Sequence, residues 1–273
     1  MAGQSEDKAS ASGGPRSAIR VMDILNKLAH APGGVPLARI YSALELPKTS
    51  TYSLLKALEH GGFIAQVDGS YRLGPEAFRL GAAIAQRRRF PEFVRPVIEK
   101  LARQSGETIL LGVLDESGEE IKYVDVIESA QPLRFIVRVG DKRPLYSSTT
   151  GKILLAYFGE ERLRAYLDSV ERIAFTPRTL TDEAALRKEV AGIRAQVWAE
   201  NIDGTTVGIT SYGAPVFEDD RRLIAAVVIA GPEARMAPRA DEMKSLALDA
   251  AGEMSRLLNC SESYPPAEVE EIG

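Results

Sequence analysis

One stretch of the chain, KTSTYSLLKALEH at Lys48 to His60, sorts its side chains onto two faces when it is placed on an α-helix. Leu54, Leu55 and Leu58 recur at the spacing of a buried stripe. The opposite face is cationic and rich in hydroxyl groups, and it carries Lys48, Thr49, Tyr52, Ser53 and Lys56. This helix follows the helical stretch PLARIYSAL across a short turn, the arrangement in which a helix-turn-helix places its second helix in the major groove of DNA. DNA binding is therefore the leading hypothesis.

The residues on either side of this helix predict the rest of a winged helix. A first helix is expected from about Ser17 to the turn Pro32-Gly33-Gly34, and a second from Pro36 to the residue before Pro47. The segment FIAQVDGSYRL predicts two short strands around Asp68-Gly69, because such a pair between hydrophobic residues favours a hairpin. The predicted DNA contacts, on the helix and on the wing, are Lys48, Thr49, Ser50, Tyr52, Ser53, Lys56, Ser70 and Arg72.

The charge of the chain is divided unevenly along its 273 residues, which suffice for two domains. Residues 1–89 contain 12 Lys and Arg against 7 Asp and Glu, a net charge of +5. The remainder contains 22 against 31, a net charge of −9. A basic part followed by an acidic part is expected where only the first meets the phosphates of DNA.

The sequence predicts neither a membrane span nor a disulfide. Its longest apolar run, LIAAVVIAG at Leu223 to Gly231, is too short to cross a bilayer and is typical of a buried strand. No hydrophobic signal segment opens the sequence, and Cys260 is its only cysteine. We therefore expect a cytoplasmic protein without a membrane partner.

Periodicity predicts an α+β fold with five parts. These are a disordered arm at 1–15, a winged helix-turn-helix at 16–74, a further helix at 75–90, an α+β sensor-like domain at 91–260, and a disordered tail at 261–273. In the fourth part we expect helices at 93–104, 150–157, 160–167, 182–200 and 240–258, and strands at 108–113, 121–126, 133–139, 205–212 and 223–230. Strands in adjacent hairpins with helices segregated around them argue against a doubly wound sheet.

Four segments carry a resemblance to a known family. They are LPKTSTYSLLKALE from Leu46, YRLGPEAFRLG from Tyr71, GDKRPLYSSTTGKILLAY from Gly140 and APVFEDDRRLIAAVVIAGP from Ala214. In this order and spacing they resemble the isocitrate-lyase-regulator (IclR) family of bacterial transcription factors, over about residues 17–258. The resemblance implies a winged helix-turn-helix, a linker helix at 75–90 and, at 91–260, a GAF-like effector-binding and oligomerisation domain whose effector is a small molecule. It also implies a homodimer, or a dimer of dimers, on a pseudo-palindromic double-stranded operator.

The resemblance also implies where the effector binds. The positions that hold a small carboxylate in relatives are occupied here by Thr149, Thr150, Asn201, Ser211, Val228 and Ala230. Asn201 stands where relatives have an acidic residue, and Val228 and Ala230 replace hydroxyl side chains. Tyr146 stands where members often have a histidine, and Ser53 where many have an arginine.

With Phe135 and Ile209 as further apolar walls, we expect a carboxylate or amide ligand with an apolar, aromatic body. The start of a helix after Thr150 would add its dipole to the binding of an anion.

Two other classes of function remain open at this stage: a small-molecule enzyme, and a sensor or adaptor that binds protein instead of DNA. GITSYG from Gly208 lacks the spacing of a nucleophile elbow, and TTGKI from Thr149 lacks that of a phosphate loop. Both histidines, His30 and His60, lie outside the predicted sensor domain, so a Ser-His-Asp triad is not available there. We expect no catalysis, no cofactor and no metal site. For Gly151 a turn into a helix, and for Lys152 a solvated side chain, are as well supported by the sequence as roles in the pocket loop.

Overall fold

The computed structural model describes residues 16–44, 47–87, 90–219, 221–260 and 264–272, with side chains not described at 16 and 85–87. The predicted arm at 1–15 lies outside the described residues. The chain forms two compact units, Met1–Arg88 and Arg89–Gly273, and this division falls beside the predicted boundary at residue 90.

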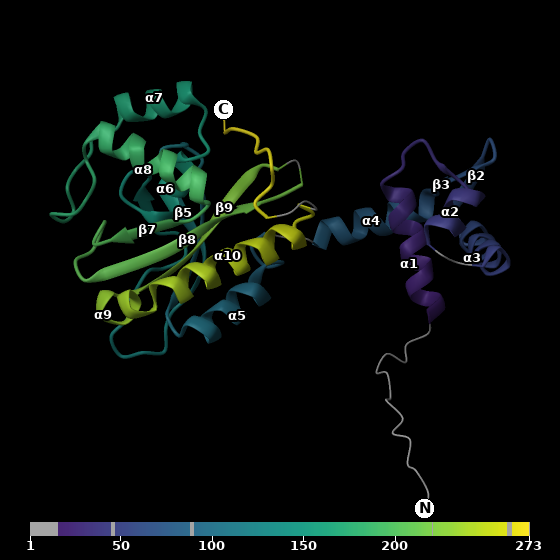
Figure 1. Ribbon diagram of the computed structural model, residues 1–273, viewed down its shortest axis with the longest axis horizontal. Helices are drawn as coiled ribbons and strands as arrows, with labels where there is room; N and C mark the ends of the chain where they lie inside the picture. Colours follow the sequence, from purple (N-terminus) through teal and green to yellow (C-terminus); the bar gives the residue numbers. More distant parts are fainter. Residues whose placement is uncertain (1–15, 45–46, 88–89, 220, 261–263, 273) are drawn as a thin grey trace, which may run out of the picture. The chain divides into compact units, whose positions relative to one another are not determined.

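The first unit is a winged helix-turn-helix (Figure 1). Its elements are α1 (Arg16–Ala29), β1 (Val35–Pro36), α2 (Leu37–Ala43), α3 (Lys48–His60), β2 (Ile64–Val67), β3 (Ser70–Leu73) and α4 (Pro75–Arg87). The strands form a sheet in the order β1-β3-β2. Ile24, Ile40, Leu55 and Tyr71, one from each of four elements, are almost fully buried and form the core of the unit.

Local sequence explains the wing, with one correction. Asp68 and Gly69 both adopt positive φ, at 49° and 74°, as a tight hairpin between β2 and β3 requires. Pro36 was expected to open the second helix, but it ends the short strand β1, and α2 begins at Leu37. Because Val35 pairs with Tyr71, β1 adds a third strand to the wing.

The second unit is a six-stranded antiparallel sheet with helices on both faces (Figure 1). Its strands are β4 (Thr108–Leu114), β5 (Glu120–Ile127), β6 (Lys142–Pro144), β7 (Ala199–Ile202), β8 (Ile209–Phe217) and β9 (Leu223–Pro232). Its helices are α5 (Arg95–Ser105), α6 (Thr149–Leu155), α7 (Glu160–Ser169), α8 (Glu183–Gln196), α9 (Glu233–Met236), the short 3-10 helix η1 (Ala237–Arg239) and α10 (Ala240–Leu257). The strand order is β6-β5-β4-β9-β8-β7.

Side chains of β9 point alternately to the two faces of the sheet, and the core of this unit therefore has two layers. Ala226, Val228 and Ala230 face the layer that contains α6, α7 and α8. Their neighbours Val227 and Ile229 face the layer that contains α5 and α10. A central strand buried on both faces needs apolar residues at every position, which explains the unbroken run LIAAVVIAG.

Three predictions for this unit were wrong. Residues 133–139 form a loop and not a strand, because β6 pairs with the free edge of β5. The predicted helix 182–200 ends at Gln196, since Val197 adopts a left-handed φ of 68° and the chain continues as β7. The strand expected from Thr205 begins at Ile209, after a turn in which Asp203 accepts a hydrogen bond from the Gly208 amide at 2.6 Å.

The end of the chain was also expected to be disordered, but residues 264–272 pack on the second unit. We call these residues the C-terminal strap. The Tyr264 hydroxyl donates to the carbonyl of Pro215 at 2.8 Å, and Glu271 pairs with Arg194 at 3.0 Å. Ile272 forms a parallel bridge with Phe158, at the end of α6. Residues 261–263 and 273 lie outside the described residues.

Candidate functional site

The exposed face of α3 is the first candidate site. Lys48, Thr49, Tyr52, Ser53 and Lys56 are exposed, and Ser50 is half-buried. The buried face consists of Thr51, Leu55 and Leu58, while Leu54 packs half-buried against the same core. Thr51 was not anticipated as a core residue. Its hydroxyl donates to the carbonyl of Pro47 at 3.1 Å, which removes it from the polar face and secures the first turn of the helix.

The two lysines of this face differ in their surroundings. Lys56 Nζ lies 2.6 Å from Glu59 Oε2 and 5.8 Å from the centre of the Tyr52 ring. The hydrogen bond to Glu59 raises the pKa of Lys56, so its charge is already shared with a carboxylate. Lys48 forms no ion pair with any residue that the structure describes. Lys48 is therefore the lysine of the pair that is free to meet a phosphate.

The wing holds the two remaining predicted DNA contacts on the same strand, β3. Ser70 follows the Asp68-Gly69 tip and pairs with Val67 across the hairpin. Arg72 is exposed, and its side chain lies against Gly34, where an added Cβ would come within 2.9 Å of Arg72 Cγ. Ser70 Cβ lies 3.2 Å from the same position, so Gly34, at a φ of 86°, makes room for both side chains.

The second candidate site is a small cavity between α6 and the sheet, which we call the sensor cavity. All eight predicted effector positions line it: Phe135, Thr149, Thr150, Asn201, Ile209, Ser211, Val228 and Ala230. Its other lining residues are Leu110, Tyr123, Ser148, Gly204 and Thr205. The space open to the centres of water molecules is about 20 Å³. A single water needs about 10 to 15 Å³ on this measure, so the walls almost touch.

Strand register places the polar residues of the sensor cavity in one row. Asn201 on β7 pairs with Ser211 on β8, and Ser211 pairs with Ala230 on β9. The Ser211 hydroxyl lies 2.5 Å from the Thr149 hydroxyl at the start of α6. The Thr150 hydroxyl is buried and makes no well-formed hydrogen bond to a described residue, although it lies near the Tyr123 hydroxyl. Hydroxyl groups from the sheet and from α6 thus converge on the cavity.

Tyr123 contributes a phenol to the wall of the sensor cavity. Desolvation raises the pKa of its hydroxyl to about 12. At neutral pH this wall of the sensor cavity therefore presents a neutral phenol.

The start of α6 is fixed by its backbone. The helix begins at Thr149 and not at Thr150, and the Ser148 hydroxyl caps it by accepting from the Gly151 amide at 3.0 Å. A Cβ at Gly151 would lie 2.3 Å from the Leu145 backbone, so only glycine allows this close approach. Because α6 has only seven residues, its dipole adds little to the binding of an anion.

Two buried polar residues near the sensor cavity have positions and partners that the sequence analysis did not predict. Lys152 is 4% exposed, and its ammonium bonds to Glu189 on α8 and to the side chain of Asn201. Tyr146 is buried outside the cavity, where its hydroxyl donates to the Ile173 carbonyl and accepts from the Ile173 amide. The partners of Lys152 and Tyr146 are distant in sequence, so no local pattern could reveal them.

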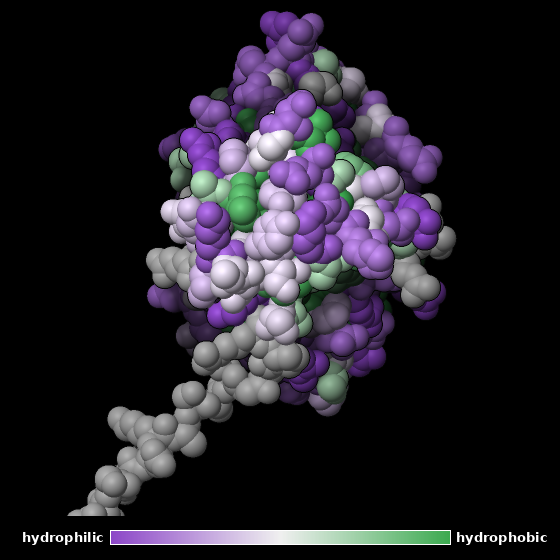
Figure 2. Space-filling model, turned by 90° about the vertical axis from the view of Figure 1, so that its right-hand side faces the viewer, coloured by the Kyte–Doolittle hydropathy of each residue, from purple (hydrophilic) through white to green (hydrophobic). Residues whose placement is uncertain are grey.

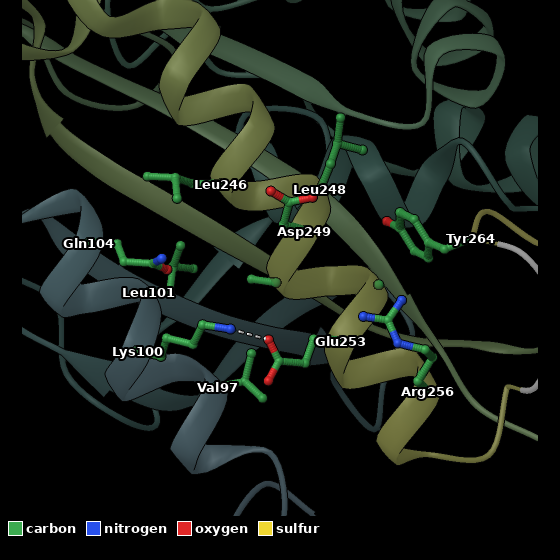
Figure 3. A pocket seen from close by; sticks show the side chains of 12 residues that line it. Val97, Lys100, Leu101, Gln104, Leu246, Leu248, Asp249, Glu253, Arg256 and Tyr264 are labelled. Atoms are coloured by element: carbon green, nitrogen blue, oxygen red, sulfur yellow. Dashed lines mark hydrogen bonds and ion pairs between the residues drawn. The ribbon is translucent and has the colours of Figure 1, made fainter. Parts of the chain in front are cut away.

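A larger groove lies on the opposite face of the sheet, between α5 and α10 (Figure 3). About 480 Å³ of it is open to the centres of water molecules. The Lys100 ammonium crosses the groove to Glu253 at 2.7 Å. This groove is open to solvent and lined by charged side chains, so it lacks the apolar enclosure of a small-molecule site.

Other classes of site find no support in the described part of the chain. No group of three or more His, Cys, Asp or Glu side chains there could hold a metal ion. In the same part, no helix is long and apolar enough to cross a bilayer.

Comparisons with known families match both units. The family model for the "Bacterial transcriptional regulator IclR C-terminal" domain matches residues 82–256. The model for the "IclR helix-turn-helix domain" matches residues 17–68.

Individual proteins are similar over nearly the whole chain. The chain is 29% identical over 250 residues to the transcriptional repressor IclR of Escherichia coli (strain K12), a match that covers 90% of this chain and 91% of that protein. It is 32% identical over 248 residues to the HTH-type transcriptional regulator BhcR of Paracoccus denitrificans (strain Pd 1222), covering 89% and 88%. HmgR of Pseudomonas aeruginosa has a solved structure that matches with a TM-score of 0.74 at 25% identity, over 91% of this chain and 100% of that one. The Agobacterium tumefaciens repressor BlcR shares the fold, with a TM-score of 0.76 at 23% identity over 89% of this chain and 98% of that one.

Proposed function

The chain belongs to the IclR family of bacterial transcriptional regulators, and on that premise we propose which of its residues contact DNA and what class of effector it binds. It is a ligand-responsive, DNA-binding regulator and not an enzyme. Family membership confirms the resemblance of the four motifs. It also removes the alternatives of an enzyme and of an adaptor that does not bind DNA.

The exposed face of α3 is the proposed major-groove surface. The proposal is supported by the difference between the two faces of the helix. Thr51, Leu55 and Leu58 are buried, whereas the lysines and the other hydroxyl side chains lie on the opposite face. Hydroxyl groups and Tyr52 can reach base edges, and Lys48 can neutralise a phosphate. Arg72 and Ser70 extend the contact to the wing.

Selection of bound DNA from a random-sequence pool by the wild-type chain tests this proposal. The selected sequences should contain two related half-sites one helical turn apart, or a multiple of that spacing. A single half-site, or DNA bound without sequence preference, would contradict the proposed mode of binding. The selected DNA then serves as the probe for all variants below.

A carboxylate with an apolar body is the proposed effector class, and the sensor cavity is its site. The support is the composition of the walls: a row of hydroxyl and amide groups faces Leu110, Phe135, Ile209 and Val228. Ligand sites of proteins enclose about 300 to 1,000 Å³. The sensor cavity must therefore widen, and we place the opening at Phe135. Its loop contributes no strand to the sheet, and its neighbour Ile136 is exposed.

Widening of the sensor cavity would also explain how the effector acts. A ligand shifts a conformational equilibrium only by the difference between its affinities for the two states. A cavity that is nearly closed in one state and open in another supplies such a difference. Effector binding then favours one relative placement of the two DNA-binding domains of a dimer.

A homodimer is the proposed unit that binds DNA. Two half-sites require two recognition helices, and apolar side chains on α1 and α4 lack partners within the first unit. Ile19 and Met22 are 63% and 64% exposed, and Phe78 is 65% exposed. Figure 2 shows a face that is mostly hydrophilic, with apolar residues in small patches. Such patches are the expected contact of a second copy of this chain.

Sensor domains could pair two dimers in the same manner. Leu133, Ile136, Val139 and Val207 are exposed on the loops that border the sensor cavity. Light scattering after size-exclusion chromatography distinguishes the two contacts. Met22→Asp with Phe78→Asp should yield monomers or dimers held by sensor domains alone, and Leu133→Asp with Ile136→Asp should yield dimers. An unchanged mass in both variants would contradict the assignment of these surfaces.

A further inference from the structure

A buried cation stands directly behind the polar wall of the sensor cavity. Lys152, on α6, is 4% exposed. Its Nζ lies 2.6 Å from Glu189 Oε1 and 3.0 Å from Asn201 Oδ1. Glu189 keeps a third of its side-chain surface in water, so the buried member of the ion pair is the ammonium. An ammonium removed from water needs acceptors on its N–H groups, and Asn201 supplies one of them.

Lys152 determines the orientation of the Asn201 side-chain amide, that is, the positions of its oxygen and its nitrogen. A lysine ammonium has three donors and no acceptor, so the atom that meets it must be the amide oxygen. The amide nitrogen then points away from Lys152, and it donates to the carbonyl of Ser147 at 2.8 Å. A Cβ at Gly204 would lie 2.2 Å from both the nitrogen and the oxygen of this amide. The amide is therefore held flat against the Gly204 backbone.

Only a donor remains available from Asn201 for a ligand. Its oxygen is taken by Lys152, and one of its two N–H groups is taken by Ser147. The second N–H has no partner among the described residues, and the side chain forms part of the cavity wall. Asn201 can thus recognise an acceptor on a ligand, but it offers nothing to a ligand's own N–H group.

No charged group in the wall of the sensor cavity opposes an anion. None of the residues that line it, all of them described, has a carboxylate, ammonium or guanidinium group. The ammonium of Lys152 lies one side chain behind the wall, and its partner Glu189 is partly screened by water. The Lys152–Glu189 pair carries no net charge, so the preference for an anion rests on the hydrogen-bond donors of the wall and on the absence of a lining carboxylate.

We propose that Lys152 is a positioning residue that acts through Asn201: it makes the polar wall of the sensor cavity a hydrogen-bond donor and thereby selects a carboxylate over the amide of the same shape. The inference rests on the proposed function of the cavity as the effector site. It narrows the effector class, because a primary amide that presents one of its own N–H groups to Asn201 meets a side chain whose only acceptor is already taken by Lys152.

Calorimetric titration of the full-length chain with matched ligand pairs tests this inference. The probes are benzoate with benzamide and phenylacetate with phenylacetamide. The wild-type chain should bind the better carboxylate at least about tenfold more tightly than its amide, since an unsatisfied buried polar group costs about 1 to 3 kcal/mol.

Asn201→Asp is the decisive variant. The new carboxylate still accepts from Lys152, but an oxygen replaces the amide nitrogen on the side of the ligand. Carboxylate affinity should fall at least about tenfold while amide affinity is kept or raised, so the order of the pair reverses. A variant that is merely destabilised would lose both ligands to the same degree.

Lys152→Met should release the Asn201 amide and bring the carboxylate-to-amide ratio towards one. The exposed Lys188→Met, on α8, is the matched control and should keep the wild-type ratio. An equal loss of both ligands in Asn201→Asp would overturn the positioning role while leaving the cavity as the effector site. Failure of the wild-type chain to bind any of the four probes would overturn the proposed effector class, and this inference with it.

Discussion

At the scale of single residues, the fit between α6 and the chain before it depends on one missing side chain. Gly151 lies so close to the Leu145 backbone that an added Cβ would stand 2.3 Å from the Leu145 carbonyl oxygen. The contact is with backbone, which cannot rotate away as a side chain can. Thr149 and Thr150 precede this glycine, so the same contact fixes the hydroxyl groups of the sensor cavity.

Gly151→Ala should therefore destabilise the second unit. We expect a loss of roughly 2 kcal/mol or more, as for other overpacked core sites. Gly192→Ala is the matched control, because Gly192 lies in α8 with nothing within 4 Å of its added Cβ. That change should stabilise the unit by up to about 1 kcal/mol through helix propensity. Thermal unfolding followed by fluorescence of Trp198, the only tryptophan, measures both. Equal effects of the two alanines would contradict the close approach.

A second residue-scale prediction concerns pH. Burial alone would raise the pKa of Asp115, but hydrogen bonds from Lys142, Ser117 and the Glu120 amide outweigh it and hold this pKa far below the usual range. The contribution of this carboxylate to stability is then complete above the unfolded pKa of about 4 and is lost as pH falls below it.

Asp115→Asn should cost stability at pH 7, and its difference from the wild type should shrink as the pH approaches 2. Urea titrations across this range, followed by Trp198 fluorescence, measure the difference. A pH-independent difference would show that the charge of Asp115 contributes nothing.

At the scale of elements, the recognition helix could be predicted from sequence because its pattern is local. Residues three or four positions apart lie on the same face of a helix, and Leu55 and Leu58 are buried as this spacing indicated. The loop at 133–139 could not be predicted in the same way. Alternating apolar residues there imitate a strand, yet pairing depends on whether a sheet edge is free, and β6 takes the edge of β5. Lys152 likewise meets Asn201 across 49 residues of sequence, so only the fold brings them together.

The unequal surroundings of the two lysines on α3 lead to a prediction for DNA binding. Lys48→Ala should weaken binding to the selected DNA and lower the slope of log affinity against log salt by about one unit. Lys56→Ala should have a smaller effect, because Glu59 already neutralises part of its charge. Glu59→Gln should release Lys56 and strengthen binding at low salt. Fluorescence anisotropy at several salt concentrations measures all three, and equal slopes for wild type and Lys48→Ala would contradict the phosphate contact.

At the scale of the whole molecule, the C-terminal strap lies beyond the family match, which ends at residue 256. It nevertheless binds elements far apart in sequence. Tyr264 contacts β8, while Ile272 and Glu271 join the ends of α6 and α8. The two helices that carry Lys152 and Glu189 are thus tied together at one end by residues that the family pattern does not describe.

A chain that ends at Cys260 should fold but melt at a lower temperature. The Tyr264 ring is partly buried, and the loss of its buried surface alone corresponds to roughly 1 to 2 kcal/mol. Tyr264→Phe removes only the hydrogen bond to Pro215 and should cost about 0.5 to 1.5 kcal/mol. Calorimetry gives the melting temperatures of the wild type, of Tyr264→Phe and of the shortened chain, and we expect them to fall in that order. A shortened chain as stable as the wild type would show that the C-terminal strap does not stabilise the second unit.

Cys260 gives this part of the molecule a natural chemical reporter. It is the only thiol in the chain, it is 5% exposed, and it packs in the same cluster as Tyr264. A thiol reagent can modify it only when the surrounding residues open locally. The rate of modification under native conditions therefore measures how often that opening occurs. Its dependence on added effector would show, without any engineered label, whether occupancy of the sensor cavity reaches the far end of α6 and α8.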